Sequence, residues 1–200
     1  GDVYKRQVYK LQNVMKDYSF FIEINYANWK DSIHTKSIEQ KWRPFDLKNF
    51  KIPEFELHPS DKGKRNYRFD LSTSTGGFII FSEKAIESLK DILEPRGQFL
   101  PVITPSKRKK YVGYYPTKPL IDGVDLEKSE QMSEDSMKNF GVTDISKLHI
   151  KKGVVLDDYI ICPELGKSCV LVTEKFRQRV EEAGLEGFDF IYSDYEITLL

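Results

Sequence analysis

Two short apolar runs, each followed by the start of an amphipathic helix, constrain the fold more than any other feature of this sequence. Residues 78–85 read F-I-I-F-S-E-K-A and residues 169–176 read C-V-L-V-T-E-K-F. A short, fully apolar run is typical of a buried strand, and Ser82 or Thr173 directly after it predicts a helix N-cap. The pattern therefore predicts two strand–helix units about 90 residues apart.

Both predicted helices have a regular apolar face and a defined end. The apolar positions of the first helix recur every three or four residues up to Leu93, and Pro95 and Gly97 follow. The apolar face of the second ends at Ala183, and Gly184 follows. Further strands are predicted at residues 99–102 and 188–192. Two explanations stay open: either this is a common way to build a strand-to-helix turn, or the domain arose by duplication with a pseudo-twofold arrangement.

The rest of the chain favours more strands. Alternating apolar residues predict strands at residues 18–26, 67–71 and 111–115. Residues 150–162 predict one or two strands that turn at Asp157 and Asp158. Residues 29–59 read as irregular with short extended pieces because prolines interrupt them, and residues 126–140 predict a polar helix. The expected fold class is α+β, with one or more mainly antiparallel sheets, two or more covering helices and two similar strand-helix-strand units. We expect a single domain over residues 8–200.

The composition excludes a disordered chain and a membrane-spanning one. Of 200 residues, 40% are hydrophobic, and 13 Phe and 11 Tyr supply ample apolar surface for a core. The longest apolar runs fall far below the roughly 20 residues that a transmembrane helix needs, so no membrane partner is expected. The net charge is zero, but residues 1–110 carry 21 Lys+Arg against 14 Asp+Glu, and residues 111–200 carry 10 against 17. Either the two halves neutralise each other, or the acidic half meets a basic partner.

The amino terminus and the cysteines bear on origin and compartment. Residues 2–7 read D-V-Y-K-R-Q, which is the translation of a transposon end from a common sequencing-library kit. We therefore interpret residues 1–7 as a sequencing artefact and leave them out of the fold prediction. No apolar segment follows a charged start, so we expect no signal peptide. Cys162 and Cys169 are too few for a disulfide framework, so reduced thiols and a cytoplasmic location are expected. The spacing of the two cysteines brackets a turn across which they can face each other.

Motifs for catalysis and cofactor binding are scarce. The sequence has no phosphate-binding G-x-x-x-x-G-K-[ST] loop, no dinucleotide motif after a strand and no G-x-S-x-G nucleophile elbow. None of the three histidines has a neighbouring residue at ligand or triad spacing. We therefore expect no catalytic residues, no cofactor and no metal. The alternative is a small hydrolase or modifying enzyme of unknown substrate, in which His149, Glu164 and the Asp157–Asp158 pair converge in a pocket.

A basic loop is the one candidate for nucleic-acid binding. Residues 106–110 read S-K-R-K-K, and Tyr111, Tyr114 and Tyr115 follow. Cations beside aromatic side chains can pair with phosphates and stack on bases. A single loop of four cations is also common at a solvated hairpin tip, and no recognised binding module surrounds it. We therefore expect no nucleic-acid partner.

An acidic segment is the candidate contact for a protein partner. It comprises Asp122, Asp125, Glu127, Glu130, Glu134 and Asp135. On the predicted helix, Glu127, Glu130 and Glu134 share one face because they are spaced three and four residues apart. The segment is either a solvated face or a contact that is complementary in charge to a basic toxin.

Four segments together resemble a bacterial protein family. Residues 76–101 resemble its central signature and residues 170–190 its carboxyl-terminal signature, while residues 121–129 are similar to its connecting segment. Trp42-Arg43-Pro44 is similar to a motif in its first part. The family is immunity family eleven of the bacterial polymorphic-toxin systems, a former domain of unknown function. The likeness covers most of residues 8–200.

The resemblance implies a cytoplasmic, non-enzymatic protein that binds a cognate toxin protein and blocks it. The matched positions are mostly apolar, capping or glycine residues, which specify the fold and not the contact surface. Steric occlusion of a toxin would use an interface of about 1,600 Å² with a few aromatic anchors. Tyr159, Tyr192 and Tyr195 are candidates for such anchors. The resemblance implies no particular oligomeric state.

Overall fold

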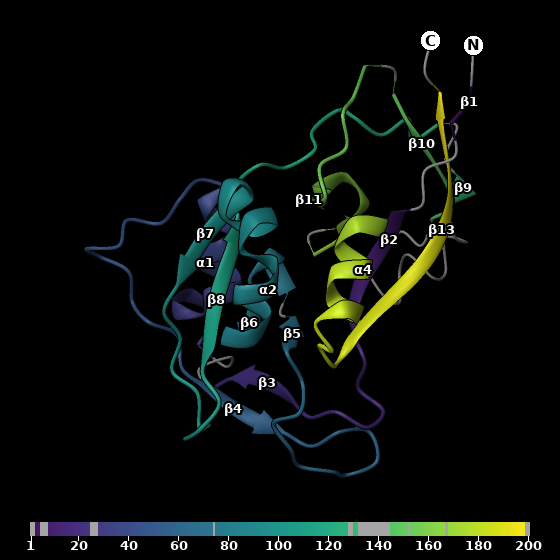
Figure 1. Cartoon of the computed structure of the whole chain (residues 1–200). Coiled ribbons are helices and arrows are strands. Elements are labelled where there is room, and N and C mark those ends of the chain that lie inside the picture. The colour runs from purple at the N-terminus through teal and green to yellow at the C-terminus, as the bar shows by residue number, and fades with distance from the viewer. Residues whose placement is uncertain are drawn as a thin grey trace.

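The computed structural model describes residues 3–4, 8–24, 28–73, 75–127, 130–131, 145–151, 153–166 and 168–198 (Figure 1). Their helices are α1 (Ile33–Gln40), α2 (Glu83–Leu93) and α4 (Glu174–Glu182), with short 3-10 turns at Trp29–Asp31, Thr75–Gly77, Glu94–Arg96 and Pro163–Leu165. The strands are β1 (Val3–Tyr4), β2 (Val8–Asn13), β3 (Phe20–Glu23), β4 (Phe55–His58), β5 (Leu71–Thr73), β6 (Ile79–Ser82), β7 (Gly97–Leu100), β8 (Tyr111–Pro116), β9 (Glu130–Gln131), β10 (Ile145–Ile150), β11 (Tyr159–Ile161), β12 (Val170–Thr173) and β13 (Phe188–Thr198). The α+β class with mainly antiparallel sheets is confirmed.

Two four-stranded units of the same topology make up most of the fold. The first unit has the strand order β5-β6-β8-β7, and α2 connects β6 to β7. The second unit has the order β11-β12-β2-β13 within a seven-stranded sheet, and α4 connects β12 to β13. In both units every neighbouring pair is antiparallel, and the strand between the two helix-connected strands comes from elsewhere in the chain.

The two units also share their strand register. In the outer ladders, β5–β6 and β11–β12, the equivalent pairs are Leu71–Phe81 and Tyr159–Val172. In the middle ladders, β6–β8 and β12–β2, they are Phe81–Val112 and Val172–Tyr9. In the remaining ladders, β7–β8 and β13–β2, they are Phe99–Tyr114 and Phe190–Leu11. A slip of one residue in any ladder would move a whole set of side chains to the opposite face. Agreement in all three ladders therefore favours duplication over a merely common strand-to-helix turn.

The central strands are exchanged between the two units. Strand β2 precedes the first unit in sequence yet lies in the second, whereas β8 follows the first unit's helix and lies in the first. If each copy begins with its central strand, the copies run β2-β5-β6-α2-β7 and β8-β11-β12-α4-β13, and each has given its first strand to the other. Neither sheet is complete without chain from the other copy.

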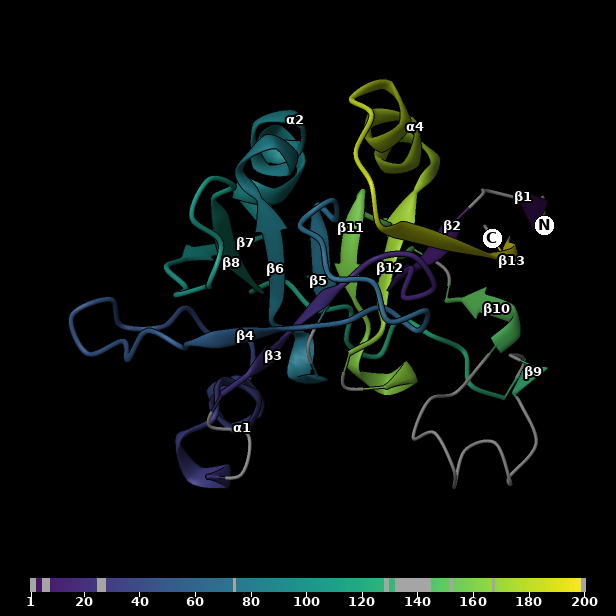
Figure 2. The same cartoon turned by 90° about the horizontal axis from the view of Figure 1, so that it is seen from below.

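The main hydrophobic core lies between the two units. It contains Leu89 of α2 and Val180 of α4, equivalent positions on two helices that lie side by side (Figure 2). In β12, Val170 and Val172 face this core while Leu171 faces a second core on the far side of the sheet. Strand β6 alternates in the same way between the main core and a third core. Both strands are buried on two faces, which explains their uninterrupted apolar sequence.

The predicted N-caps differ in the structure. The Ser82 hydroxyl caps α2 by accepting the Ala85 N–H at 3.1 Å, as predicted, and also donates to Asp70 at 2.7 Å. Thr173 occupies the N-cap position of α4, as predicted, but its side chain makes no capping bond. Its hydroxyl donates instead to Asp158 at 2.8 Å. Asp70 and Asp158 directly precede β5 and β11, so the same aspartate–hydroxyl pair occurs in both units.

Two insertions cover the outer cores and correct several predictions. Residues 14–70 carry α1, β3 and β4, and residues 117–158 carry β9 and β10. The prediction of irregular structure at residues 29–59 is wrong because α1 starts there, where the Ser32 hydroxyl accepts the Thr35 N–H at 3.2 Å. The strand predicted at 18–26 is shorter, and that at 67–71 starts only at Leu71.

The chain ends lie together in the structure. Val3 and Tyr4, from the segment left out of the sequence prediction, pair with Thr198 and Ile197 of β13. Strand β2, which the sequence analysis did not predict, begins soon after them. None of the helices formed by the described residues has the length and apolar character needed to span a membrane.

A polar contact fixes the exchanged strand β2 against α4 and predicts a pH dependence. The Tyr9 hydroxyl donates to Glu174 at 2.5 Å, and the Arg177 Nε donates to the same carboxylate at 2.9 Å. The Arg177 hydrogen bonds, followed by that from Tyr9, lower the pKa of Glu174 from 4.5 to about 2. A carboxylate with a lowered pKa stabilises the folded protein above its unfolded-state pKa and loses that contribution as the pH falls.

We expect the free energy of unfolding to decrease between about pH 4.5 and pH 2, and the Glu174→Gln variant to show a smaller decrease. Urea denaturation at a series of pH values, followed by circular dichroism, measures both. Glu87→Gln is the control, since Glu87 is an exposed residue of α2. Identical pH profiles for the Glu174→Gln variant and the wild type would show that the contact does not contribute.

Candidate functional site

The described part of the acidic segment comprises a bend at Asp122, an isolated bridge between Val124 and Ile150, a turn at residues 126–127 and strand β9. Its backbone is fixed, because the Asp122 N–H donates to the Glu164 carboxylate and the Asp125 N–H donates to the His149 carbonyl at 2.8 Å. Asp122 and Glu127 are exposed, whereas Asp125 is half-buried. The carboxylates at 122 and 127 are therefore presented to solvent by an ordered backbone.

The helix predicted over residues 126–140 is wrong at its start. Leu126 and Glu127 form a turn, and Glu130 lies in β9, so Glu127 and Glu130 do not share a helix face. Glu134 and Asp135 lie outside the described residues. The helical pattern failed because β9 pairs with β10, a tertiary contact that overrides a local preference for helix.

Exposed apolar side chains accompany these carboxylates. Ile121 is 64% exposed and Leu126 is 42% exposed. Of the eight large apolar residues that are exposed in the described part of the chain, seven lie in the two insertions; the set is Met15, Ile24, Leu47, Ile52, Ile103, Ile121, Leu126 and Val155. The insertions are thus where the molecule presents apolar surface to its surroundings.

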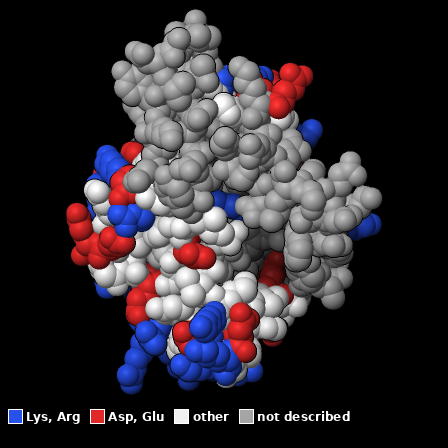
Figure 3. Space-filling model, turned by 90° about the vertical axis from the view of Figure 1, so that its right-hand side faces the viewer, with Lys and Arg blue, Asp and Glu red and all other residues white. Residues whose placement is uncertain are grey.

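The basic loop connects β7 and β8, as expected for a hairpin, but one of its cations is used within the fold. Lys109 forms an ion pair with Asp70 at 3.0 Å and donates to the Phe69 carbonyl at 3.0 Å. Lys107, Arg108 and Lys110 are exposed. On the face in Figure 3, Lys and Arg gather at the lower end, where Figure 1 shows the loops after β2 and β4.

The groups named for a hydrolase already have other partners. Asp157 pairs with Arg96 at 3.2 Å, and Asp158 accepts the Thr173 hydroxyl. Glu164 instead binds the backbone of Asp122. These carboxylates serve to connect segments, which gives no support to a shared catalytic pocket. Within the described residues, no group of three or more His, Cys, Asp and Glu is arranged to hold a metal ion.

The cysteines and the central tyrosine are buried. Cys162 and Cys169 lie on either side of a turn, and the Cys162 N–H donates to the Cys169 carbonyl at 2.8 Å. Burial raises the pKa of the Cys162 thiol, which keeps it protonated and unreactive at neutral pH. Tyr159 is only 2% exposed, so the prediction that it anchors a partner is wrong. The side chains of Tyr192 and Tyr195 lie outside the described part of the structure.

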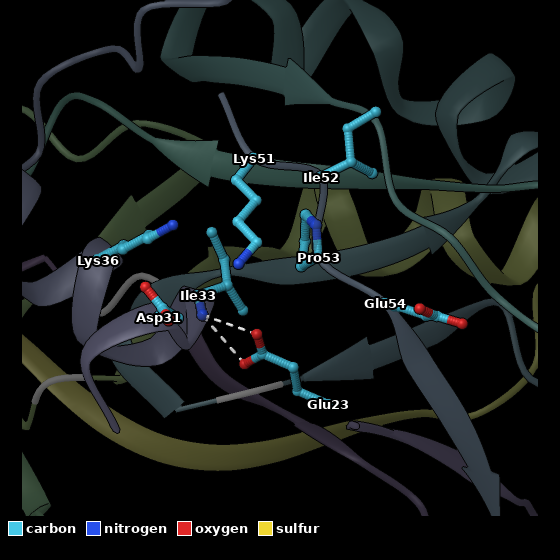
Figure 4. A pocket seen from close by; sticks show the side chains of 8 residues that line it. All are labelled: Glu23, Asp31, Ile33, Lys36, Lys51, Ile52, Pro53 and Glu54. Atoms are coloured by element: carbon cyan, nitrogen blue, oxygen red, sulfur yellow. Dashed lines mark hydrogen bonds between the residues drawn. The ribbon is translucent and has the colours of Figure 1, made fainter. Parts of the chain in front are cut away.

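A polar pocket of about 110 Å³ lies between β3, the start of α1 and residues 51–54 (Figure 4). It is lined by Glu23, Asp31, Ile33, Lys36, Lys51, Ile52, Pro53 and Glu54. Both oxygens of Glu23 accept the Ile33 N–H at 3.0 Å. Ile33 is the first residue of α1, and the helix dipole favours a negative charge at this amino-terminal end. Burial raises the pKa of Glu23, while this hydrogen bond acts against the rise.

This pocket could not be predicted from the sequence, because helix α1, which forms one of its walls, was not predicted. The signal was present in Ser32 followed three residues later by Thr35, but Ile33 and Ile38 alone make a weak apolar face. Three carboxylates and two lysines line the pocket, an arrangement that suits polar contact with another protein.

Comparison with known proteins adds no assignment. A scan against models of protein families gives no match to this chain, and a search of curated proteins gives none either. The resemblance to immunity family eleven therefore stays a prediction that rests on the four segments named above.

Proposed function

We propose that this protein is a non-enzymatic immunity protein that acts in the bacterial cytoplasm by binding a cognate toxin and blocking it. The resemblance of residues 76–101 and 170–190 to the immunity family supports the proposal. The structural observation that supports it most is the concentration of exposed apolar side chains in the two insertions. Contiguous apolar surface marks protein–protein contact sites, and these side chains are the candidates for such surface.

The duplicated units suit the role of a rigid support. Their strands are joined by exchange and their helices share one core, so the insertions are held on a scaffold that moves little on binding. To block a toxin, the protein only has to cover the toxin's active site with an interface that buries about 800 Å² of surface on each partner. No reactive group is needed for that.

The acidic segment is the contact that we propose for a basic toxin. Asp122 and Glu127 are exposed beside Ile121 and Leu126, which combines charge with apolar area. Exposed charges at the edge of an interface mainly accelerate association and contribute little to the final affinity. The same proposal extends to Glu130, Glu134 and Asp135 as predicted from the sequence.

Co-expression with the toxin encoded by the neighbouring open reading frame tests the proposed function. We expect growth to be restored and the two proteins to co-purify as a stable complex. The double variant Asp122→Lys, Glu127→Lys should associate with the toxin roughly tenfold more slowly at low salt. The control Glu87→Lys, in an exposed position of α2, should associate at the wild-type rate. Unchanged killing together with no complex would refute the proposal for this toxin.

A further inference from the structure

The small sheet β3–β4 is extended by one residue at the end that approaches the pocket. The Ile24 N–H donates to the Glu54 carbonyl at 3.0 Å, which continues the β3–β4 pairing. On its other side Glu54 forms an isolated parallel bridge with Ile103, whose N–H donates to the Pro53 carbonyl at 3.0 Å. Ile24, Glu54 and Ile103 therefore lie next to each other across three segments of chain.

These three side chains point outward together with Ile52. Residues directly opposite one another in a sheet present their side chains on the same face, and residues two apart in a strand do so too. Pro53 and Phe55 are buried, whereas Ile52 and Glu54 are exposed. We call Ile24, Ile52, Ile103 and Glu54 the Glu54 patch.

The patch is apolar except for one carboxylate. Ile24 is 47% exposed, Ile52 43% and Ile103 48%. In Figure 4 the Glu54 carboxylate points away from Glu23 and Asp31. Among the charged residues that line the pocket, Lys36 and Lys51 match Glu23 and Asp31 in number, so Glu54 adds one excess negative charge. Within the described residues, no cation lies within ion-pair distance of Glu54.

The carboxylate specifies what can cover the patch. Burying the three isoleucines against a partner would take Glu54 out of water, and a buried carboxylate is costly unless a cation pairs with it. A second copy of this chain, placed about a twofold axis through the patch, would bring the two Glu54 carboxylates together and would be opposed by their repulsion. The occupant that fits presents a lysine or arginine between apolar side chains.

We propose that the Glu54 patch anchors the toxin, by accepting one lysine or arginine of the toxin at Glu54 between Ile24, Ile52 and Ile103. The inference rests on the proposed function and gives it a contact residue. A paired charge in an apolar setting has the character of an interface hot spot, in which a cation from the partner is desolvated and held by a fixed carboxylate. The acidic segment lies in the other insertion and is separate from this patch.

Binding of the purified toxin domain, encoded by the neighbouring open reading frame, to variants of the patch tests the inference. We expect Glu54→Gln to weaken binding roughly tenfold or more and to accelerate dissociation, because it leaves the toxin's cation unpaired. Ile103→Asp should weaken binding at least as much. The matched control Glu87→Gln removes an exposed glutamate from α2 and should bind as the wild type does. Thermal unfolding by circular dichroism confirms that each variant is folded.

Three results would overturn the inference. The first is that the wild type binds the toxin and that Glu54→Gln and Ile103→Asp bind with dissociation constants within twofold of the wild-type value. This result leaves the proposed function standing but removes the patch from the interface. The second is a wild-type dimer that the Ile103→Asp variant dissolves, which assigns the patch to a second copy of the chain. The third is absence of binding by the wild type, which refutes the proposed function and this inference with it.

Discussion

The variant Phe176→Ala is expected to lose about 3–5 kcal/mol of unfolding free energy, which is a large share of the stability of an ordinary domain. Phe176 is 0% exposed, and its ring centroid lies 5.9 Å from that of Tyr159 and 6.3 Å from that of Phe188. Removing the ring deletes buried apolar area and leaves a cavity that the surrounding strands cannot close, because those strands are fixed by their ladders.

The same variant tests whether the two units unfold together. Phe176 belongs to the second unit, whereas Trp42 covers the first and stacks on Tyr115 with ring centroids 5.7 Å apart. Because the units exchange their central strands and share one core, the unfolding midpoint reported by Trp42 fluorescence should shift as far as that reported by circular dichroism. The chain has two tryptophans, so the measurement uses a Trp29→Phe background in which Trp42 is the only one left.

Lys175→Ala is the control for this measurement. Lys175 neighbours Phe176 on α4, but its side chain is 58% exposed and its ion pair with Asp158 spans 3.6 Å. Exposed ion pairs contribute little, so the unfolding free energy should change by less than about 1 kcal/mol. A Phe176→Ala variant that lowers the circular dichroism midpoint without moving the Trp42 transition would show that the units unfold independently.

The sequence predicted the elements whose causes are local. Strands β6 and β12 and helices α2 and α4 were found because a buried strand, a hydroxyl cap and an amphipathic helix each leave a pattern within a few residues. The α+β class followed from these elements. Strand β2 was missed because its partners, such as Thr173 opposite Val8, are far away in sequence and contribute no local pattern.

Tertiary contacts decided what sequence patterns could not. Ser82 and Thr173 follow similar strands, yet only Ser82 caps its helix, since the Thr173 hydroxyl is taken by Asp158. Candidate contacts followed the same rule. The acidic segment could be found from its local amino-acid composition. The Glu54 patch could not, because it depends on a bridge between Glu54 and Ile103, which are 49 positions apart in the printed sequence (54 to 103).

The second large effect is expected at Asp70, where Asp70→Ala should lower the unfolding free energy by about 3 kcal/mol. The Asp70 carboxylate accepts the Ser82 hydroxyl at 2.7 Å and the Glu186 N–H at 2.8 Å, and it pairs with Lys109 at 3.0 Å. Its side chain is 4% exposed, so water cannot replace the lost acceptor. The variant would leave the buried Ser82 hydroxyl, the half-buried Glu186 N–H and the half-buried Lys109 ammonium without this acceptor.

The duplication supplies the matched control, Asp158→Ala. Asp158 accepts the Thr173 hydroxyl at 2.8 Å, which repeats the Asp70–Ser82 pair, but its side chain is 24% exposed and its cations lie 3.6 and 4.0 Å away. Water can solvate the groups that this variant releases, so a cost of about 1 kcal/mol is expected. Urea denaturation of both variants measures the difference. Equal costs at the two positions would mean that burial does not set the strength of the aspartate–hydroxyl pair.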